Sequence, residues 1–333
     1  MKENWLIRFI GARIIKTGLA TFLTALICMV LNLNPIFAVI TSIVTIEPTA
    51  KASLKKAFVR FPASILGAFI AVISTYFFGE SPLSYSLAAT VTIFVCYQLK
   101  LIDGMLVAAI TAVAMVPVIH DAFVYNFISR LATTTIGLTT AGLVNFIILP
   151  PKYITQIENI NKNMERRILE IYINRLKELL IGEYESNISM KQMTSLQQSA
   201  TKIEQLIKYQ KEENDYHRTK KESKAYIRKV EMAYHTNRLL NSHLLNLIYL
   251  PEETFITFTE NERRAISNLI ISYKDLLNHK EFKKQKKAAS ILKNSVKGLD
   301  EFDENQIKSH IIYEILMINR IINDRFSNIT KKG

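Results

Sequence analysis

Charged residues are scarce in the first half of this 333-residue chain, and helix-breaking residues are scarce in the second. Up to residue 151 there are ten Lys or Arg and five Asp or Glu, whereas the remainder holds thirty-two and twenty-four. Seven of the eight prolines and seven of the ten glycines fall in the first half. Two environments explain this division better than one soluble core does. We therefore predict a membrane-embedded domain over residues 1–151 and a charged domain over residues 152–333.

The sequence also lacks the local motifs of common enzymes. It has no P-loop, GxGxxG, GxSxG or HExxH motif, and the histidines of the second half are scattered. Its two cysteines, Cys28 and Cys96, lie in apolar segments and form no CxxC pair. We expect no enzymatic activity, no metal and no cofactor.

The net charge of +13 raises the question of a nucleic-acid partner. A soluble nucleic-acid-binding protein would not carry the long uncharged stretches of this chain. The lipid bilayer, with its anionic cytoplasmic leaflet, is therefore the expected partner, and no nucleic acid is expected.

Long uncharged runs predict about six transmembrane spans. Residues 17–46 contain no charge, and 30 helical residues would be about 45 Å long, more than a ~30 Å hydrocarbon core requires. A break at residues 32–35 therefore suggests two spans joined by a tight turn. The second span is short and could instead be re-entrant, so four or five spans are possible. The predicted spans are residues 14–31, 35–50, 61–79, 85–99, 105–119 and 131–149.

Lys and Arg collect before the first span, between the second and third, between the fourth and fifth, and after the sixth. Because such residues favour the cytoplasmic side, this distribution predicts that both termini lie in the cytoplasm.

Glu47 follows the first long uncharged run directly and precedes Pro48. A carboxylate inside a bilayer usually pairs or marks a transport path, and proline removes one helical hydrogen bond, which frees a carbonyl near Val44. The functional interpretation is a proton- or substrate-coupled carboxylate beside Lys51 and Arg60. The alternative is an interfacial carboxylate paired locally with Lys51 at i+4.

Other basic residues of the first half have interpretations of their own. Lys16 is expected to extend to the cytoplasmic interface. Residues 51–60 read as a short basic helix, either on the membrane surface or lining a vestibule that attracts anions. Arg60 precedes Gly67 by seven residues, and Arg130 precedes Gly137 by the same interval. This is either coincidence or the trace of a three-plus-three inverted repeat, which would place one arginine near each membrane face.

The second half reads as helix almost throughout, with apolar residues at three- and four-residue spacing. Four or five such helices predict a cytoplasmic antiparallel bundle. Polar residues expected to line it are His243, Asn305, His310 and Glu314. The fold class is therefore all-α, a polytopic transmembrane helical domain followed by a helical bundle.

Several segments resemble the bacterial aromatic acid exporter family, among the fusaric-acid-resistance-like membrane proteins. The resemblance covers nearly the whole chain and is most specific in the Ile46-Glu47-Pro48-Thr49 segment. It is closest to a small branch of Gram-positive proteins with a cytoplasmic C-terminal domain. The segments are residues 11–18, 35–41, 45–49, 53, 60, 67, 130–137, 246–251 and 304–310.

The resemblance implies a plasma-membrane exporter of small amphipathic anions such as aromatic carboxylic acids. Larger relatives have two membrane modules and this chain has one, which implies a homo-oligomer. In this hypothesis Glu47 couples protons and Pro48 shapes the helix break. Lys51 and Arg60 attract the anion, and Arg130 offers a counter-charge on the exit side. The rival hypothesis is a membrane-anchored sensor or scaffold that acts through the helical domain, and a third is a channel.

Overall fold

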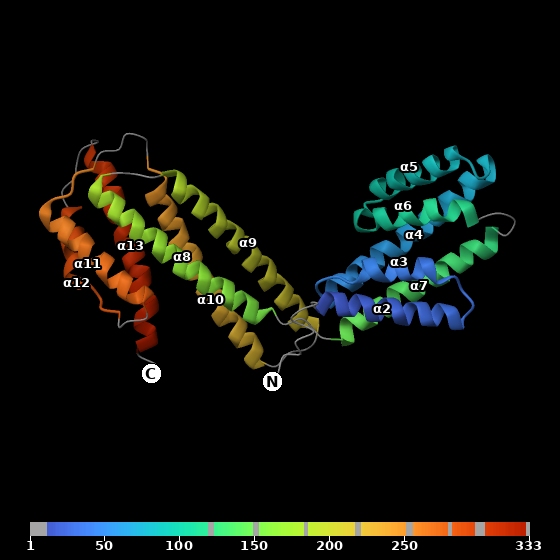
Figure 1. Cartoon of the computed structure of the whole chain (residues 1–333), viewed down its shortest axis with the longest axis horizontal. Coiled ribbons are helices and arrows are strands. Elements are labelled where there is room, and N and C mark those ends of the chain that lie inside the picture. Colours follow the sequence, from blue (N-terminus) through green and yellow to red (C-terminus); the bar gives the residue numbers. More distant parts are fainter. Residues whose placement is uncertain are drawn as a thin grey trace. The chain divides into compact units, whose positions relative to one another are not determined.

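The computed structural model describes residues 12–118, 123–148, 153–182, 186–216, 221–250, 256–278, 282–296 and 304–330 (Figure 1). Throughout these ranges the regular structure is helical and no strand occurs, which confirms the all-α prediction. The chain divides into two compact units. The first comprises Met1–Lys152 with Tyr209–Arg218, and the second comprises Tyr153–Lys208 with Thr219–Gly333.

The described residues up to 148 form six α-helices and one short 3₁₀ turn. Of these, α2 and α4 are long and apolar enough to cross a membrane, whereas α3 and α6 are shorter apolar helices. With 11 and 14 residues, α3 and α6 cover about 16 and 21 Å, less than a ~30 Å hydrocarbon core. The elements are α2 (Ala12–Val30), α3 (Pro35–Thr45), α4 (Ala50–Phe78), α5 (Pro82–Gln98), α6 (Ile102–Met115), η1 (Val116–Val118) and α7 (Phe123–Ile147).

The predicted turn between the first two helices is present. The side chain of Asn34 accepts a hydrogen bond from the Ile36 amide, and Pro35 occupies the first turn of α3, where its missing N–H costs nothing. Asn32 adopts the left-handed conformation with φ of 52°. Lys100 adopts it with φ of 58° in the corresponding turn between α5 and α6.

The close helix crossings of the first unit also occur as an equivalent pair. The principal partners are α4 with α6 and α3 with α7 (Figure 1). A Cβ added to Gly67 of α4 would lie 2.4 Å from the Ala108 carbonyl oxygen of α6. A Cβ added to Gly137 of α7 would lie 2.5 Å from the Ala38 carbonyl oxygen of α3. The interval along the chain from Gly67 to Gly137 equals the interval from Ala38 to Ala108. The helices α2–α7 of the first unit therefore form two similar halves, α2–α4 and α5–α7, that make reciprocal contacts.

One expectation about this unit is wrong. Residues 51–60 do not form a separate short helix, because α4 runs without interruption from Ala50 to Phe78 and includes Pro62. The basic segment is the first part of a 29-residue helix.

The second unit is built from α8 (Ile154–Ile181), most of α9 (Ser186–Tyr216), α10 (Lys221–Ile248), α11 (Glu260–Leu277), α12 (Lys286–Ser295) and α13 (Glu304–Thr330). Here α8 packs against α10 and α11, and α13 packs against α10 and α12. The core contains the Ile stripe of α13 and the rings of Tyr172 and Tyr273, whose centroids lie 5.5 Å apart. His243 Nδ1 lies 2.6 Å from a carboxylate oxygen of the buried Glu314. The side chain of Asn305 lies outside the described residues.

Candidate functional site

The helix break after α3 exposes several backbone groups, and side chains of α4 and α7 satisfy them. Pro48 prevents α3 from continuing, and the Val44 carbonyl accepts a hydrogen bond from Arg60 Nη1 at 3.0 Å. The prediction that Pro48 frees the Val44 carbonyl is thus confirmed. Ser53 Oγ donates to the Thr45 carbonyl at 2.8 Å and accepts from the Glu47 amide at 3.1 Å.

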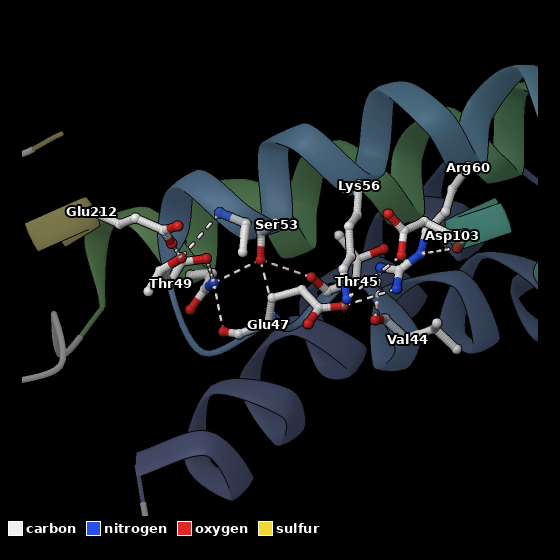
Figure 2. Close-up of polar contacts among 11 residues, drawn as sticks. Val44, Thr45, Glu47, Thr49, Ser53, Lys56, Arg60, Asp103 and Glu212 are labelled. Atoms are coloured by element: carbon white, nitrogen blue, oxygen red, sulfur yellow. Dashed lines mark hydrogen bonds and ion pairs between the residues drawn. The ribbon is translucent and has the colours of Figure 1, made fainter. Parts of the chain in front are cut away.

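Glu47 sits at the centre of an ion-pair cluster (Figure 2). Its Oε1 lies 2.8 Å from Arg60 Nη2 and 3.2 Å from Lys56 Nζ. The Arg60 side chain is 8% exposed and the Glu47 side chain 12%, so this pair is largely withdrawn from solvent. Arg60 Nε also donates to the Asp103 carbonyl at 3.3 Å, which ties the cluster to the start of α6. One carboxylate therefore holds two cations of α4 beside a broken helix.

A second polar network reaches the same break from α2 and α7. Asn145 Nδ2 donates to the Glu47 and Thr49 carbonyls at 3.1 and 3.3 Å and to Ser53 Oγ at 2.7 Å. Lys16 Nζ donates to Asn145 Oδ1 at 2.8 Å and to its carbonyl at 3.2 Å. Lys16 is 4% exposed, so the expectation that it extends to the interface is wrong. A side-chain acceptor in the helical interior offers its ammonium group a better partner.

The start of α4 is capped by acidic residues from the last turns of α9, which belong to the first unit. Glu213 Oε1 accepts a hydrogen bond from the Ala50 amide at 2.7 Å. Glu212 Oε2 accepts one from the Thr49 hydroxyl at 2.8 Å, as Figure 2 shows. Carboxylates at a helix N-terminus satisfy free amides and the positive end of the helix dipole.

Arg130 of α7 lies apart from the Glu47 cluster and is 4% exposed. Its Nη2 donates to Thr111 Oγ1 of α6 at 2.5 Å. Its guanidinium carbon lies 4.0 Å from the centroid of the Phe37 ring of α3, a cation–π contact.

Residues 8–148 match the family model described as aromatic acid exporter family member 1. The whole chain is also similar to UPF0421 proteins of staphylococci. It is 52% identical to that of Staphylococcus saprophyticus over 328 residues, which cover 98% of this chain and 100% of the relative. The chain belongs to the UPF0421 proteins, and its first half matches the aromatic acid exporter model. The identities to the relatives in Staphylococcus haemolyticus and Staphylococcus aureus are 48% and 43%, each over 98% of this chain and 99% and 100% of the relative.

In this UPF0421 protein, the predicted site residues are brought together only in part. Glu47 contacts Arg60, and Pro48 follows Glu47 in the break between α3 and α4. Lys51 is exposed and makes no described contact with Glu47, so the i+4 pairing is wrong. Lys56 takes that place because α4 is one continuous helix, on which Lys56 and Arg60 lie one turn apart on the same face.

Sequence reasoning missed Asn145, Glu212 and Glu213. Asn145 had a usable signal, since an amide within the uncharged run of residues 131–149 is costly unless it is hydrogen-bonded. The two glutamates had none, because their contacts with Thr49 and Ala50 join residues that lie far apart in the sequence.

A groove of about 490 Å³ runs between the first half of α4 and the second half of α7. Its lining is mostly apolar and includes Phe58, Leu138 and Phe146. Ser53, which binds the broken backbone, also faces this groove. An apolar groove next to buried polar groups suits an amphipathic molecule.

Proposed function

We propose that this protein exports small amphipathic anions, such as aromatic carboxylic acids, through the α2–α7 helices of a bacterial plasma membrane. The match of residues 8–148 to the exporter family model supports transport. The cluster of Glu47, Lys56 and Arg60 at a helix break carries the proposal for this chain, because interrupted helices with buried charges form transporter sites.

The proposed topology has six membrane passages with both termini in the cytoplasm. Repeated halves of three helices support it, because a three-helix unit repeated in the membrane has the opposite orientation in its second copy. The short α3 and α6 occupy equivalent places in the two halves. In the proposed topology each forms a membrane passage together with the residues that flank it. The second unit is then cytoplasmic, and a homo-oligomer is proposed because the chain has one membrane module.

Protonation of Glu47 would release both Arg60 and Lys56, which an anion could then bind. By linkage, proton binding and anion binding at this cluster favour each other, so this cluster alone carries proton and anion in the same direction. Exchange in opposite directions needs an anion site away from Glu47. The membrane potential adds an outward force on any anion, about 2.3 kcal/mol per charge at 100 mV.

The test measures efflux of labelled benzoate from cells that lack the protein and from cells that express it. Glu47→Gln, at equal membrane abundance, is expected to abolish the added efflux or its dependence on pH. Lys56→Gln and Lys55→Gln form a matched pair, because both remove one charge from α4 but only Lys56 contacts Glu47. The first is expected to impair efflux and the second to leave it unchanged.

Cytoplasmic pH recorded during efflux gives the direction of coupling. Alkalinisation indicates that proton and anion leave together, and acidification indicates exchange. Equal efflux with and without the wild-type protein would exclude this class of substrate. Normal efflux by Glu47→Gln would leave transport standing and make Glu47 structural.

A second candidate function is sensing of an anionic ligand by the helical bundle. A groove of about 670 Å³ in the second unit favours it. Four cations line this groove together with a single carboxylate, and the cations are Arg167, Lys177, Lys191 and Lys274. In the full-length protein, the double variant Lys177→Glu with Lys274→Glu is expected to abolish the regulatory response to the anionic ligand. Its benzoate efflux is expected to remain intact. Loss of efflux at unchanged abundance would argue against a separate sensing role.

A further inference from the structure

Arg130 is a buried cation whose hydrogen bonds are incomplete. Its Nη2 binds the Thr111 hydroxyl, but Nε and Nη1 are fully buried and have no acceptor among the described residues. The Phe37 ring covers a face of the guanidinium plane and does not occupy its N–H groups, which point outward within that plane. Thr134, one helical turn after Arg130, also has a buried hydroxyl for which the described chain supplies no partner.

The repeat identifies Arg60 as the counterpart of Arg130. The interval along the chain between the two arginines equals the interval between Gly67 and Gly137. The match extends to Ser64 and Thr134, which are spaced identically and whose buried hydroxyls both lack a partner in the described structure. Arg60 has the carboxylate of Glu47. The same interval counted from Glu47 leads to Pro117, in η1, which has no carboxylate to offer.

Among the described residues of α2–α7, the acidic side chains have other partners. Glu47 binds Arg60 and Lys56, Asp103 lies 4.0 Å from Lys56, and Glu80 accepts from the Tyr85 hydroxyl. Lys16 has Asn145 and the electrostatic attraction of Glu213. Arg130 forms no ion pair in the part of the chain that the structure describes, and Asp121 lies outside that part.

We propose that Arg130 binds the carboxylate group of the transported anion, with Thr134 as a neighbouring hydroxyl donor and Phe37 as the aromatic wall of the site. The substrate takes the place in the second half that Glu47 takes in the first. Recognition by a guanidinium group suits a carboxylate, since two of its N–H groups can meet the two oxygens. The class of anion rests on the proposed function, but the assignment to Arg130 rests on the contacts above.

This site is separate from the Glu47 cluster. Phe37 and Val44, which contact Arg130 and Arg60 respectively, are two helical turns apart on α3, or about 10 Å along the helix. An anion at Arg130 therefore leaves the Glu47–Arg60 pair intact. That separation supplies the second location that exchange of a proton for an anion requires.

The experiment measures equilibrium binding of labelled benzoate to the purified full-length protein in lipid nanodiscs. Arg130→Gln is expected to weaken binding at least ~30-fold, the effect of removing one partner from a buried charge pair. Arg130→Lys keeps the charge and serves if Arg130→Gln does not fold; it is expected to bind more weakly than wild type. Lys55→Gln, which removes an exposed cation, is the control and is expected to bind as wild type does.

Wild-type affinity in both Arg130 variants would overturn the assignment. So would binding that appears only in Asp121→Asn, because it would show that the chain's own carboxylate neutralises Arg130. Chloride binding through Arg130 without benzoate binding would overturn the carboxylate assignment. Efflux that persists in Arg130→Gln would refute this inference and leave the proposed function standing. Arg130-dependent benzoate binding without efflux would support the inference and refute the exporter.

Discussion

Replacing Gly137 with alanine tests the helix contact that positions Arg130 and the α3 half-helix. The added Cβ would meet the Ala38 carbonyl oxygen at 2.5 Å and the Thr41 Cβ at 3.0 Å. Real Cβ atoms almost never approach below 3.0 Å, so α3 and α7 must move apart to accommodate the methyl group. The obstacle is helix backbone, which cannot rotate away as a side chain can. Small residues at such crossings exist because they let backbones approach closely.

Two effects of opposite sign decide how much Gly137→Ala changes the free energy of unfolding. Alanine is favoured over glycine within a helix by about 1 kcal/mol. Overpacking a tight contact costs about 1–3 kcal/mol. The clash is expected to win, because the substitution also disturbs the hydroxyl contacts of Thr41. Gly142→Ala lies in the same helix, and nothing lies within 4 Å of its added Cβ, so it keeps only the favourable effect.

The assay is reversible unfolding in mixed detergent micelles, followed by far-ultraviolet circular dichroism at matched protein concentration. Gly142→Ala is expected to be neutral or more stable. The two variants should differ by about 1–3 kcal/mol, the cost of the clash, because the gain in helix propensity is common to both. Gly67→Ala should resemble Gly137→Ala, because its Cβ meets the Ala108 carbonyl at 2.4 Å. Equal stability of Gly137→Ala and Gly142→Ala would refute the close crossing and with it the reciprocal packing of the halves.

Three further predictions concern buried polar contacts. Asn145→Leu should destabilise the first unit by about 3–5 kcal/mol, because it leaves the buried Lys16 ammonium group without its acceptor. Adding Lys16→Met to Asn145→Leu should restore part of that stability. Unfolding of both single variants and the double variant in detergent checks this. Arg175→Met should cost about 2–4 kcal/mol in thermal or chemical unfolding, because Arg175 binds the last carbonyls of α10, those of Leu247 and Ile248, at 2.7 and 3.0 Å. Burial raises the pKa of Glu262, but hydrogen bonds from Lys308 and the Thr259 amide outweigh burial and hold that pKa below its ordinary value. The stability that Glu262 contributes is therefore present above its unfolded pKa of about 4.5 and is lost as pH falls further, and Glu262→Gln should flatten this part of the pH–stability curve.

Local sequence signals predicted the features that depend on local chemistry. Asn34 and Pro35 end one helix and begin the next through a side-chain cap and a missing amide, both of which are encoded within a single turn. Pro48 frees the Val44 carbonyl for the same local reason. The Ile stripe of residues 307–322 predicted a buried helix because its spacing matches the helical period, and α13 buries it.

Features that depend on tertiary packing were predicted poorly. The charges at residues 51–60 suggested a separate short helix, yet α4 continues through Pro62. Lys56 and Arg60 find partners on α6 and in the break between α3 and α4. Lys16 was placed at the interface because its partner, Asn145, belongs to a helix at the other end of the membrane unit's sequence. Only two arginines and two glycines pointed to the repeat, whereas the reciprocal crossings with Ala38 and Ala108 make it clear.

The asymmetry between the halves bears on the sign of the transported ion. Two arginines in equivalent places, each with its own carboxylate, would leave an interior with no preference for either sign. Instead Glu47 neutralises Arg60, and Lys16 has Asn145 and nearby Glu213, while Arg130 has only a hydroxyl and an aromatic face among the described residues. A buried, uncompensated guanidinium group is costly, and an anion lowers that cost where a cation raises it. Replacement of a carboxylate position by Pro117 in one half would thus convert an internal ion pair into a binding site, and it would make that site selective for anions.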